Sequence, residues 1–496
     1  MVIWAIVECL NNFDSCIFSA DKVSNNQSSI YFFNTLTRKK EKFKPLEEGK
    51  VKIYTCGPTV YDFAHIGNFR AFLFEDLLKR WLIQRGYKVT HVMNLTDIDD
   101  KTIKGSQKEG IPLSQFTDFY VKAFFEDIKV LNIESANFYP KATDQIPEIV
   151  TLIKTLMAKG IAYKGEDNSI YFSVSKFPDY GRLSKIKVNE LKVGARVNQD
   201  EYAKEEAQDF ALWKAWTPDD GDAFWETELG KGRPGWHIEC SAMSMKYLGE
   251  TFDIHCGGVD NMFPHHENEI AQSEAATGKK FVNYWMHNEH LQVEGKKMSK
   301  SLGNFYTLRD LLAKGYDPIS IRYLLMSTHY RQQFNFTFES LEASKAAVER
   351  LRNFVRRLHE AEGEINTGKV AILSAKLEAC FGGSMDDDLN IGVALSSLFD
   401  FIREINGLLD ANLVSKLEAA DVGGLMMRID DVLGVVGRVE MEDTLPSEID
   451  VLVQKREKAR KKKKWKEADA IRSELKSMGI ILEDTAQGVK WRKEKV

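Results

Sequence analysis

Two motifs far apart in the chain combine residue types that suit a polyphosphate. The first is HIGN at residues 65–68, and the second is KMSKS at residues 297–301. An imidazole and a glycine at a helix start can bring ring and backbone N–H groups to phosphate oxygens. Lysines on a mobile loop can neutralise the charge that develops as pyrophosphate leaves. The two motifs therefore predict an ATP site built from two halves.

The elements around the first motif place it where a helix begins. Residues 51–56 (VKIYTC) predict a short buried strand, which Gly57 and Pro58 end. Residues 69–84 have the apolar periodicity of a helix, and residues 87–94 predict a second strand. This βαβ unit is typical of nucleotide-binding sheets, and its helix N-terminus favours phosphate.

The second motif is expected on a loop. Lys297 and Lys300 follow an aromatic strand at residues 281–286, and glycines flank the motif on both sides. Thr307, with Asp310 three residues later, predicts the start of the next helix. Such a loop can close over a bound nucleotide.

Either motif alone occurs by chance in unrelated chains, and a lone run of Lys and Ser is more often a solvated loop. Together and in this order they resemble the two signature motifs of class I aminoacyl-tRNA synthetases. Further segments narrow the resemblance to the cysteinyl-tRNA synthetase family: residues 94–100 (NLTDIDD), 235–243 (GWHIECSAM) and 263–272 (FPHHENEIAQ). The resemblance extends over roughly residues 30–496.

Four residues could bind a metal ion. Pro264 suits the first turn of a helix, so His265 and Glu269 would lie one turn apart on the same face. Cys56 and Cys240 offer thiolates, which zinc accepts together with imidazole and carboxylate. From the residues alone, two buried cysteines and an ordinary helical His/Glu pair explain the pattern equally well. The resemblance implies that Cys56, Cys240, His265 and Glu269 bind one Zn²⁺ ion per chain.

Zinc would explain how a site for cysteine rejects similar amino acids. Cysteine differs from serine by one atom, and an apolar pocket discriminates such pairs by only about 1–3 kcal/mol. Binding of the substrate thiolate by zinc uses the chemistry in which cysteine is unique, so no editing domain is needed. Because four protein ligands complete a tetrahedral site, the substrate must enter as a fifth ligand or displace the glutamate. The sequence leaves both routes open.

The resemblance implies a reaction in two steps. The carboxylate of L-cysteine attacks the α-phosphate of ATP to give cysteinyl-adenylate, and the terminal ribose of tRNA(Cys) then takes the aminoacyl group. We expect His65 and Lys300 to contact the phosphates, with Lys297 in support and Mg²⁺ accompanying ATP. Gly67 and Asn68 would also lie against ATP. Asn68 stands where the family commonly has histidine, and it can donate a hydrogen bond but carries no charge.

Three further residues are expected to line the amino-acid pocket. Trp236 would form a wall, Asp260 would pair with the substrate ammonium group, and Thr96 would lie beside them. An aromatic side chain next to a ligand-bearing helix is as often part of the ordinary core. Cys256 stands at a position where glycine is more usual in the resembled family. We expect it to be a buried thiol rather than an auxiliary metal ligand.

A basic segment near the end of the chain is the expected contact for tRNA. Residues 455–466 read KREKARKKKKWK. The candidate contacts are Lys461, Lys462, Lys463, Lys464 and Trp465, with lysines for phosphates and tryptophan for stacking. From the pattern alone a solvated helix face is equally compatible. In the resembled family this end of the chain contacts the anticodon, and the net charge of −5 means that any such contact is local.

The composition and the cysteine spacing argue against a membrane protein and against a disulfide-rich scaffold. A chain of 496 residues that is 43% hydrophobic and 28% charged is typical of a globular protein with several domains. No run of 18 apolar residues is present, so we expect no membrane partner. Residues 1–7 are apolar but lack the basic leader of a signal peptide. The six cysteines have no framework spacing, which favours the reducing cytoplasm. We expect a monomer.

The expected fold is α/β: a Rossmann-type parallel-sheet catalytic domain split by an insertion, followed by a helical bundle and a small C-terminal domain. Residues 1–29 would be an extension outside the resemblance. The expected domain boundaries are 30–130 and 233–340 for the two catalytic halves, 131–232 for the connective insertion, 341–440 for the bundle, and 446–496 for a small basic anticodon-binding domain.

Two other functions share much of this pattern. A related ligase that transfers cysteine to an amino sugar would keep both signatures and the four metal ligands, but should lack the basic RNA module. A catalytically inactive paralogue could bind zinc and RNA without chemistry. His65 and Lys300 are intact, which argues against the paralogue, and Asn68 is the weak point. The basic end of the chain favours tRNA as acceptor.

Overall fold

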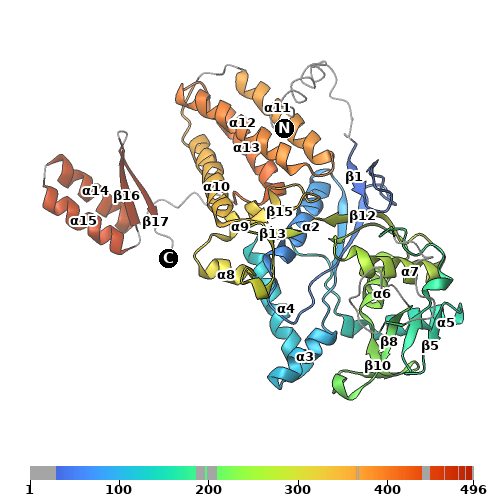
Figure 1. Ribbon diagram of the computed structural model, residues 1–496. Helices are drawn as coiled ribbons and strands as arrows, with labels where there is room; N and C mark the ends of the chain where they lie inside the picture. The colour runs from blue at the N-terminus through green and yellow to red at the C-terminus, as the bar shows by residue number, and fades with distance from the viewer. Residues whose placement is uncertain are drawn as a thin grey trace.

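The computed structural model describes residues 29–185, 196–197, 209–364, 366, 368–437, 447–462, 464–478, 480–485 and 488–493. The expected extension at residues 1–29, apart from its last residue, lies outside the described part of the chain. Figure 1 shows a helical bundle at the top, an insertion at the lower right and a small C-terminal unit at the left.

A four-stranded parallel sheet forms the centre of the catalytic region. Its order is β12-β11-β3-β4, and all three pairings are parallel. The strands are β3 (Lys50–Thr55), β4 (Lys88–Met93), β11 (Phe252–Gly258) and β12 (Val282–Asn288). Because β11 follows the insertion in the chain and pairs with β3, the sheet is assembled from two halves. This confirms the predicted Rossmann-type sheet.

Helix α2 (Ile66–Gln84) connects β3 to β4 and begins within the HIGN motif, as expected, three residues before the apolar periodicity that starts at residue 69. In the structure His65 is the N-cap residue. Its side chain accepts a hydrogen bond from the Asn68 N–H, and the Asn68 side chain accepts one from the His65 N–H. This capping box extends the helix through the HIGN motif, and polar caps of this kind leave no trace in an apolar periodicity.

The insertion combines helices with a separate, mainly antiparallel sheet. After β4, α3 (Asp100–Glu109) and α4 (Leu113–Val130) belong to the predicted first catalytic half, and η2 (Ala142–Gln145) and α5 (Ile146–Ala158) lie within the insertion. The sheet order is β5-β6-β8-β10-β9, with β7 paired to β8. Its elements are β5 (Ala162–Lys164), β6 (Ile170–Phe172), η3 (Val174–Lys176), β7 (Arg196–Val197), β8 (Asp209–Ala215), η6 (Pro218–Asp220), β9 (Trp225–Thr227) and β10 (Gly230–Pro234). Strand β10 therefore extends this sheet to residue 234, just past the predicted end of the insertion at residue 232. Helix α6 (Trp236–Leu248) follows.

The segments that carry the other site residues follow β11. The turn η7 (Met262–His266) precedes α7 (Glu267–Thr277). A small sheet has the order β14-β13-β15 and consists of β13 (Leu291–Val293), β14 (Lys296–Lys297) and β15 (Phe334–Phe336). Between β14 and β15 lie η8 (Lys300–Leu302), α8 (Leu308–Ala313) and α9 (Pro318–Met326). The KMSKS motif thus runs from β14 into η8, and the capping box predicted at Thr307 and Asp310 starts α8.

The remaining elements form the bundle, an N-terminal hairpin and the C-terminal unit. The bundle contains α10 (Phe338–His359), α11 (Lys369–Asp386), α12 (Ile391–Asp410) and α13 (Lys416–Leu433), which share one hydrophobic core with α2. The hairpin is β1 (Tyr31–Asn34) and β2 (Lys39–Lys42). The C-terminal unit contains α14 (Ser447–Lys461), α15 (Trp465–Ser477), β16 (Ile480–Thr485) and β17 (Gly488–Lys493), and has a small core of its own. Among the described residues, no helix combines the length and the apolar character needed to cross a membrane.

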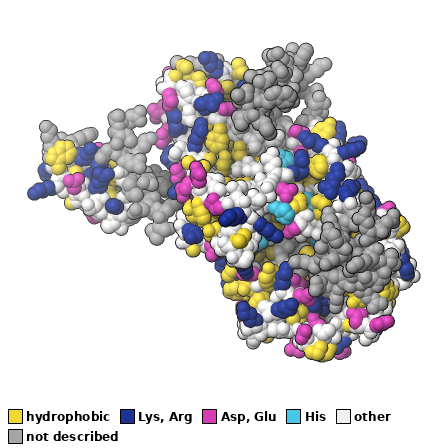
Figure 2. Space-filling view, viewed as in Figure 1, with side chains coloured by type: hydrophobic (Ala, Val, Ile, Leu, Met, Phe, Trp, Pro, Cys, Tyr) yellow, Lys and Arg dark blue, Asp and Glu magenta, His cyan; other side chains and the backbone are white. Residues whose placement is uncertain are grey.

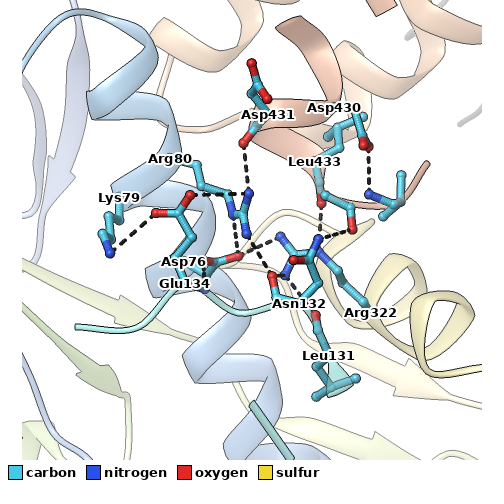
Figure 3. A network of polar contacts seen from close by, with 12 residues as sticks. Asp76, Lys79, Arg80, Leu131, Asn132, Glu134, Arg322, Asp430, Asp431 and Leu433 are labelled. Atoms are coloured by element: carbon cyan, nitrogen blue, oxygen red, sulfur yellow. Dashed lines mark hydrogen bonds and ion pairs between the residues drawn. The ribbon is translucent and has the colours of Figure 1, made fainter. Parts of the chain in front are cut away.

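A buried polar network joins the bundle to α2 (Figure 3). Asp76 of α2 accepts hydrogen bonds from Arg80 Nε at 2.9 Å and from Arg322 Nη2 at 2.6 Å. Arg322, on α9, also donates to the carbonyl of Leu433 at the end of α13 at 2.8 Å. Arg80 donates to the carbonyl of Asp431 at 3.0 Å. These bonds compensate the buried charges and fix α2, α9 and α13 relative to one another.

Candidate active site and metal centre

His65 is held in one orientation at the start of α2. Its Nδ1 accepts a hydrogen bond from the Asn68 N–H at 3.1 Å, so the neutral ring carries its proton on Nε2. Burial lowers the pKa of His65, and the charge of Asp260 opposes this effect. The Asn68 side chain is also engaged, because its Oδ1 accepts from the His65 N–H at 3.1 Å. The arrangement presents a neutral imidazole N–H at a helix N-terminus, which suits a phosphate oxygen.

The second motif lies directly against the first. The His65 ring meets the Phe305 ring edge-on, with centroids 5.2 Å apart. A Cβ added to Gly67 would lie 3.0 Å from the His65 ring and 3.4 Å from Met298 Cε. Glycine therefore lets the two motifs approach this closely. The structure brings together the two halves that the sequence assigned to one ATP site.

The lysines of the second motif are exposed. Lys297 lies in β14, and Lys300 begins η8 with its Nζ 2.5 Å from Asp62 Oδ2. The Lys300 Nζ also lies 5.1 Å from the centroid of the Phe305 ring. The hydrogen bond from Lys300 to Asp62 raises the pKa of Lys300. Lys300 is therefore fully charged at neutral pH. The Phe305 ring contacts both the Lys300 ammonium group and the His65 ring.

The four candidate metal ligands come together from four different elements. Cys56 follows β3, Cys240 lies on α6, His265 on η7, and Glu269 on the first turn of α7. Their donor atoms all lie within 4.8 Å of one another. His265 Nε2 is 3.2 Å from Glu269 Oε1. Cys56 is half-buried and the other three are buried, so the set forms a compact donor cluster of two sulfurs, a nitrogen and an oxygen.

Two buried atoms of this cluster, His265 Nε2 and Glu269 Oε1, lie 3.2 Å apart without hydrogen-bond geometry, and neither has a hydrogen-bond partner among the described residues. Leaving such atoms unsatisfied is costly. Burial lowers the pKa of His265 to about 3, so its ring is neutral and can offer a lone pair to a cation. A hydrogen bond with Cys240, and then burial, raise the pKa of Cys56, so thiolates here need a cation beside them. The donor set and the unsatisfied atoms fit a zinc ion.

His255 and His266 belong to a second donor set, which no motif in the sequence predicted. With Cys56 and Glu269, their donor atoms also lie within 4.8 Å of one another. His255 Nε2 is 3.0 Å from Glu269 Oε2, and His266 Nε2 is 3.3 Å from Cys56 Sγ. The signal in the sequence was the clustering of six of the ten histidines within residues 237–290. Cys256 is fully buried on β11, belongs to neither described set, and has its pKa raised by burial.

The three residues expected in the amino-acid pocket have different surroundings. Trp236 stacks on His265, with ring centroids 4.0 Å apart and an interplanar angle of 16°. Thr96 is buried, and its Oγ1 accepts a hydrogen bond at 3.1 Å from the amide side chain two residues before it. Asp260 is exposed on the loop between β11 and η7. On the face seen in Figure 2, the visible histidine side chains gather between the bundle and the insertion.

The expected tRNA contacts lie where α14 ends and α15 begins. Lys462 and Lys464 are exposed, and Trp465 is 58% exposed. Lys464 Nζ lies 3.2 Å from Glu467 Oε2. Lys463 and the side chain of Lys461 lie outside the described residues. The basic segment is therefore divided by a turn, which presents exposed cations beside a tryptophan.

Comparison with known proteins bears on all of these regions. The sequence family described as tRNA synthetases class I (C) catalytic domain matches residues 42–346, the DALR domain family matches residues 380–437, and the cysteinyl-tRNA ligase anticodon binding domain family matches residues 442–492. The cysteine-tRNA ligase of Protochlamydia amoebophila is 51% identical over 468 residues, which cover 94% of this chain and 98% of that protein. The cysteine-tRNA ligase of Chlamydia muridarum is 50% identical over 475 residues, which cover 94% and 99%.

Among solved structures, a Mycobacterium tuberculosis methionyl-tRNA synthetase in complex with methionyl-adenylate superposes with a TM-score of 0.61 at 14% identity. The match covers 78% of this chain and 92% of that chain. This likeness concerns the fold alone. The split parallel sheet and the catalytic-domain match define a class I aminoacyl-tRNA synthetase. Identity to relatives over nearly the whole length then narrows the class, and this chain belongs to the cysteine-tRNA ligase family.

Proposed function

We propose that this protein activates L-cysteine with ATP to give cysteinyl-adenylate and transfers the cysteinyl group to tRNA(Cys), with one Zn²⁺ ion selecting the substrate thiolate. The observation that carries the zinc proposal is the buried donor cluster of Cys56, Cys240, His265 and Glu269, with donor atoms within 4.8 Å of one another. Cys56 and His65 lie on the same connection between β3 and α2, so the metal ligands and the first signature motif share one edge of the sheet.

The four donors would hold zinc, which supplies when bound a Lewis acid with high affinity for thiolate sulfur. Selectivity then rests on the substrate's own sulfur, since a serine hydroxyl is a far poorer ligand for this ion. Trp236, stacked on His265, would keep that ligand in place and wall the pocket. Asp260 would accept the substrate ammonium group, and Thr96 would line the pocket from the segment after β4.

The residues of the two signature motifs would act on the phosphates of ATP. His65 would donate from Nε2, because its Nδ1 is occupied by the Asn68 N–H. Gly67 and Asn68 would lie against the nucleotide at the start of α2. Lys300, supported by Lys297, would neutralise charge on the departing pyrophosphate. Mg²⁺ would accompany ATP as its own counter-ion.

The basic turn before α15 would contact tRNA. Its described cations, Lys462 and Lys464, flank the turn, and exposed Trp465 offers a stacking face. The family match over residues 442–492 supports this proposal, and it favours tRNA over an amino-sugar acceptor. Intact His65 and Lys300 favour an active enzyme over an inactive paralogue.

The domain boundaries and location are proposed on the same basis. We propose the boundaries given from the sequence: two catalytic halves at 30–130 and 233–340, an insertion at 131–232, a bundle at 341–440 and a C-terminal domain at 446–496.

We also propose a cytoplasmic location, because the four described cysteines, which are Cys56, Cys240, Cys256 and Cys380, are free thiols. We propose that the protein works as a monomer.

The test is ATP–pyrophosphate exchange with each of the twenty amino acids, on protein of known zinc content, followed by tRNA charging. Exchange with cysteine alone, and loss of exchange after chelation, are expected. Cys240→Ser should lower both zinc content and exchange. Cys256→Ser is the matched control, because Cys256 is equally buried but lies outside both donor sets. Normal exchange by metal-free Cys240→Ser protein would overturn the zinc proposal.

A further inference from the structure

The Asp62 carboxylate pairs with the cation proposed for the ATP phosphates. Asp62 Oδ2 lies 2.5 Å from Lys300 Nζ, while its Oδ1 accepts a hydrogen bond from the Phe63 N–H at 2.8 Å. The second bond fixes the direction of the carboxylate. Asp62 lies on the connection between β3 and α2, only three residues before His65. A carboxylate of the first half of the ATP site therefore holds the lysine of the second half.

The backbone around Lys300 is fixed independently of this ion pair. Asn304 Oδ1 accepts from the Ser299 N–H at 2.9 Å, and Asn304 Nδ2 donates to the Lys297 carbonyl at 3.1 Å. The Ile66 N–H donates to the carbonyl of Tyr306 at 3.0 Å, which ties the end of the loop to the first motif. With the backbone anchored on both sides, the Lys300 side chain is the part that can change partner.

We propose that Asp62 is a positioning residue for the enzyme's reaction: it holds Lys300 beside the ATP site before ATP arrives and yields it to the triphosphate. This inference rests on the proposed role of Lys300 at the phosphates. The side chains of Asp62 and Lys300 are 34% and 66% exposed, and an exposed pair of this kind is weak. A triphosphate with several negative charges can therefore displace the carboxylate.

The sign of the effect on ATP binding follows from competition. Because Lys300 leaves Asp62 when it turns to the triphosphate in this proposal, the Asp62–Lys300 pair stabilises the nucleotide-free state and weakens the binding of ATP. Removal of the Asp62 charge should therefore tighten binding. The gain expected for an exposed ion pair is about 1.5- to 5-fold in Kd.

The test compares Asp62→Asn with wild type in the binding of Mg²⁺ and β,γ-methylene-ATP, measured by calorimetry on the full chain. The control is Asp410→Asn, which removes an ion pair of the same length with Arg357 in the bundle. We expect a Kd about 1.5- to 5-fold lower for Asp62→Asn and no change for the control. We also expect faster trypsin cleavage after Lys300 in the nucleotide-free variant. An unchanged or higher Kd would overturn the proposal.

A second pair of variants separates the ion pair from simple repulsion between Asp62 and ATP. In a Lys300→Met background, only the repulsion remains, so the gain from Asp62→Asn should be smaller than in wild type. An equal gain in both backgrounds would overturn the proposal while leaving the role of Lys300 intact. Undiminished ATP–pyrophosphate exchange by Lys300→Met would instead overturn the role of Lys300, and this inference with it.

Discussion

Asp76 Oδ2 and Arg322 Nη2 lie 2.6 Å apart, and neither side chain is exposed to solvent. Asp76 is on α2, which begins at the first signature motif, and Arg322 is on α9, which follows the second. Burial lowers the pKa of Arg322, and the Asp76 carboxylate opposes that effect. The pair therefore fixes the helices that follow the two signature motifs relative to one another (Figure 3).

Asp76→Asn should destabilise the protein by about 3–5 kcal/mol, because it leaves the charge of Arg322 buried without a counter-ion. Thermal unfolding followed by circular dichroism and by loss of ATP–pyrophosphate exchange would measure this. Asp410→Asn, which breaks an exposed pair, should change the unfolding temperature little. An Asp76→Asn protein that unfolds at the same temperature as this control would contradict the structural role of the pair.

His91 should contribute to the loss of stability in acid. It is fully buried beside Thr55, with Nε2 3.0 Å from Thr55 Oγ1, and burial lowers its pKa to about 3. In the unfolded chain its pKa is about 6.5, so between these values the unfolded state binds a proton that the folded state does not. The contribution is complete above about pH 6.5 and falls by about 1.4 kcal/mol per pH unit towards pH 3.

The measurement is the change in the free energy of unfolding between pH 7 and pH 5. His91→Gln keeps a hydrogen-bonding side chain but does not titrate, so it should lose less stability over this interval than wild type, by about 2 kcal/mol. Equal losses for the two proteins would show that His91 does not titrate in the way that its burial requires.

The sequence predicted the parts of the site that local geometry determines. HIGN at a strand-turn-helix junction and a His/Glu pair one helical turn apart are both set by spacing along the chain. The apolar periodicity of α2 begins only at residue 69, because the capping box of His65 and Asn68 that starts the helix is polar. The approach of Cys240 to Cys56 depends on the strand order of the sheet, which brings α6 and β3 together.

Other features of the site depend on contacts between segments distant in sequence. The pairing of Asp62 with Lys300 spans 238 residues. The bond from His255 to Glu269 joins a strand to a helix. No propensity or motif specifies these contacts before the fold is known. Clustering of histidines in the sequence indicated an imidazole-rich region but could not say which rings meet Cys56.

The role of Asn68 can be tested by changing its charge. Asn68→Asp keeps the oxygen that accepts from the His65 N–H, but it places a carboxylate beside the proposed phosphate site. We predict a KM for ATP about tenfold higher than that of Asn68→Ala, in ATP–pyrophosphate exchange, because of charge repulsion. Asn68→Ala should lower stability by about 1 kcal/mol, because it removes the hydrogen bond that the Asn68 side chain accepts in the capping box, while His65 stays as the N-cap. Equal KM values for the two variants would mean that Asn68 does not face the phosphates.

The C-terminal cations should affect tRNA and leave amino-acid activation unchanged. The double variant Lys462→Gln/Lys464→Gln should raise the KM for tRNA. The slope of log K for tRNA binding against log[salt] should become less steep by about 0.7–0.9 for each phosphate that is no longer neutralised. Lys279→Gln is a matched control, since Lys279 is similarly exposed and also paired to a glutamate. A salt dependence identical to wild type would show that this turn does not contact phosphates.

We propose that the ion that Cys56, Cys240, His265 and Glu269 would hold binds the sulfur of the substrate. Zinc K-edge X-ray absorption, on zinc-loaded protein alone and with L-cysteine or L-serine, measures this most directly. We predict two sulfur ligands at about 2.3 Å in the free protein, from Cys56 and Cys240, and three with L-cysteine. L-Serine should leave the count at two. An unchanged sulfur count in the presence of saturating L-cysteine would contradict selection of the substrate by the metal.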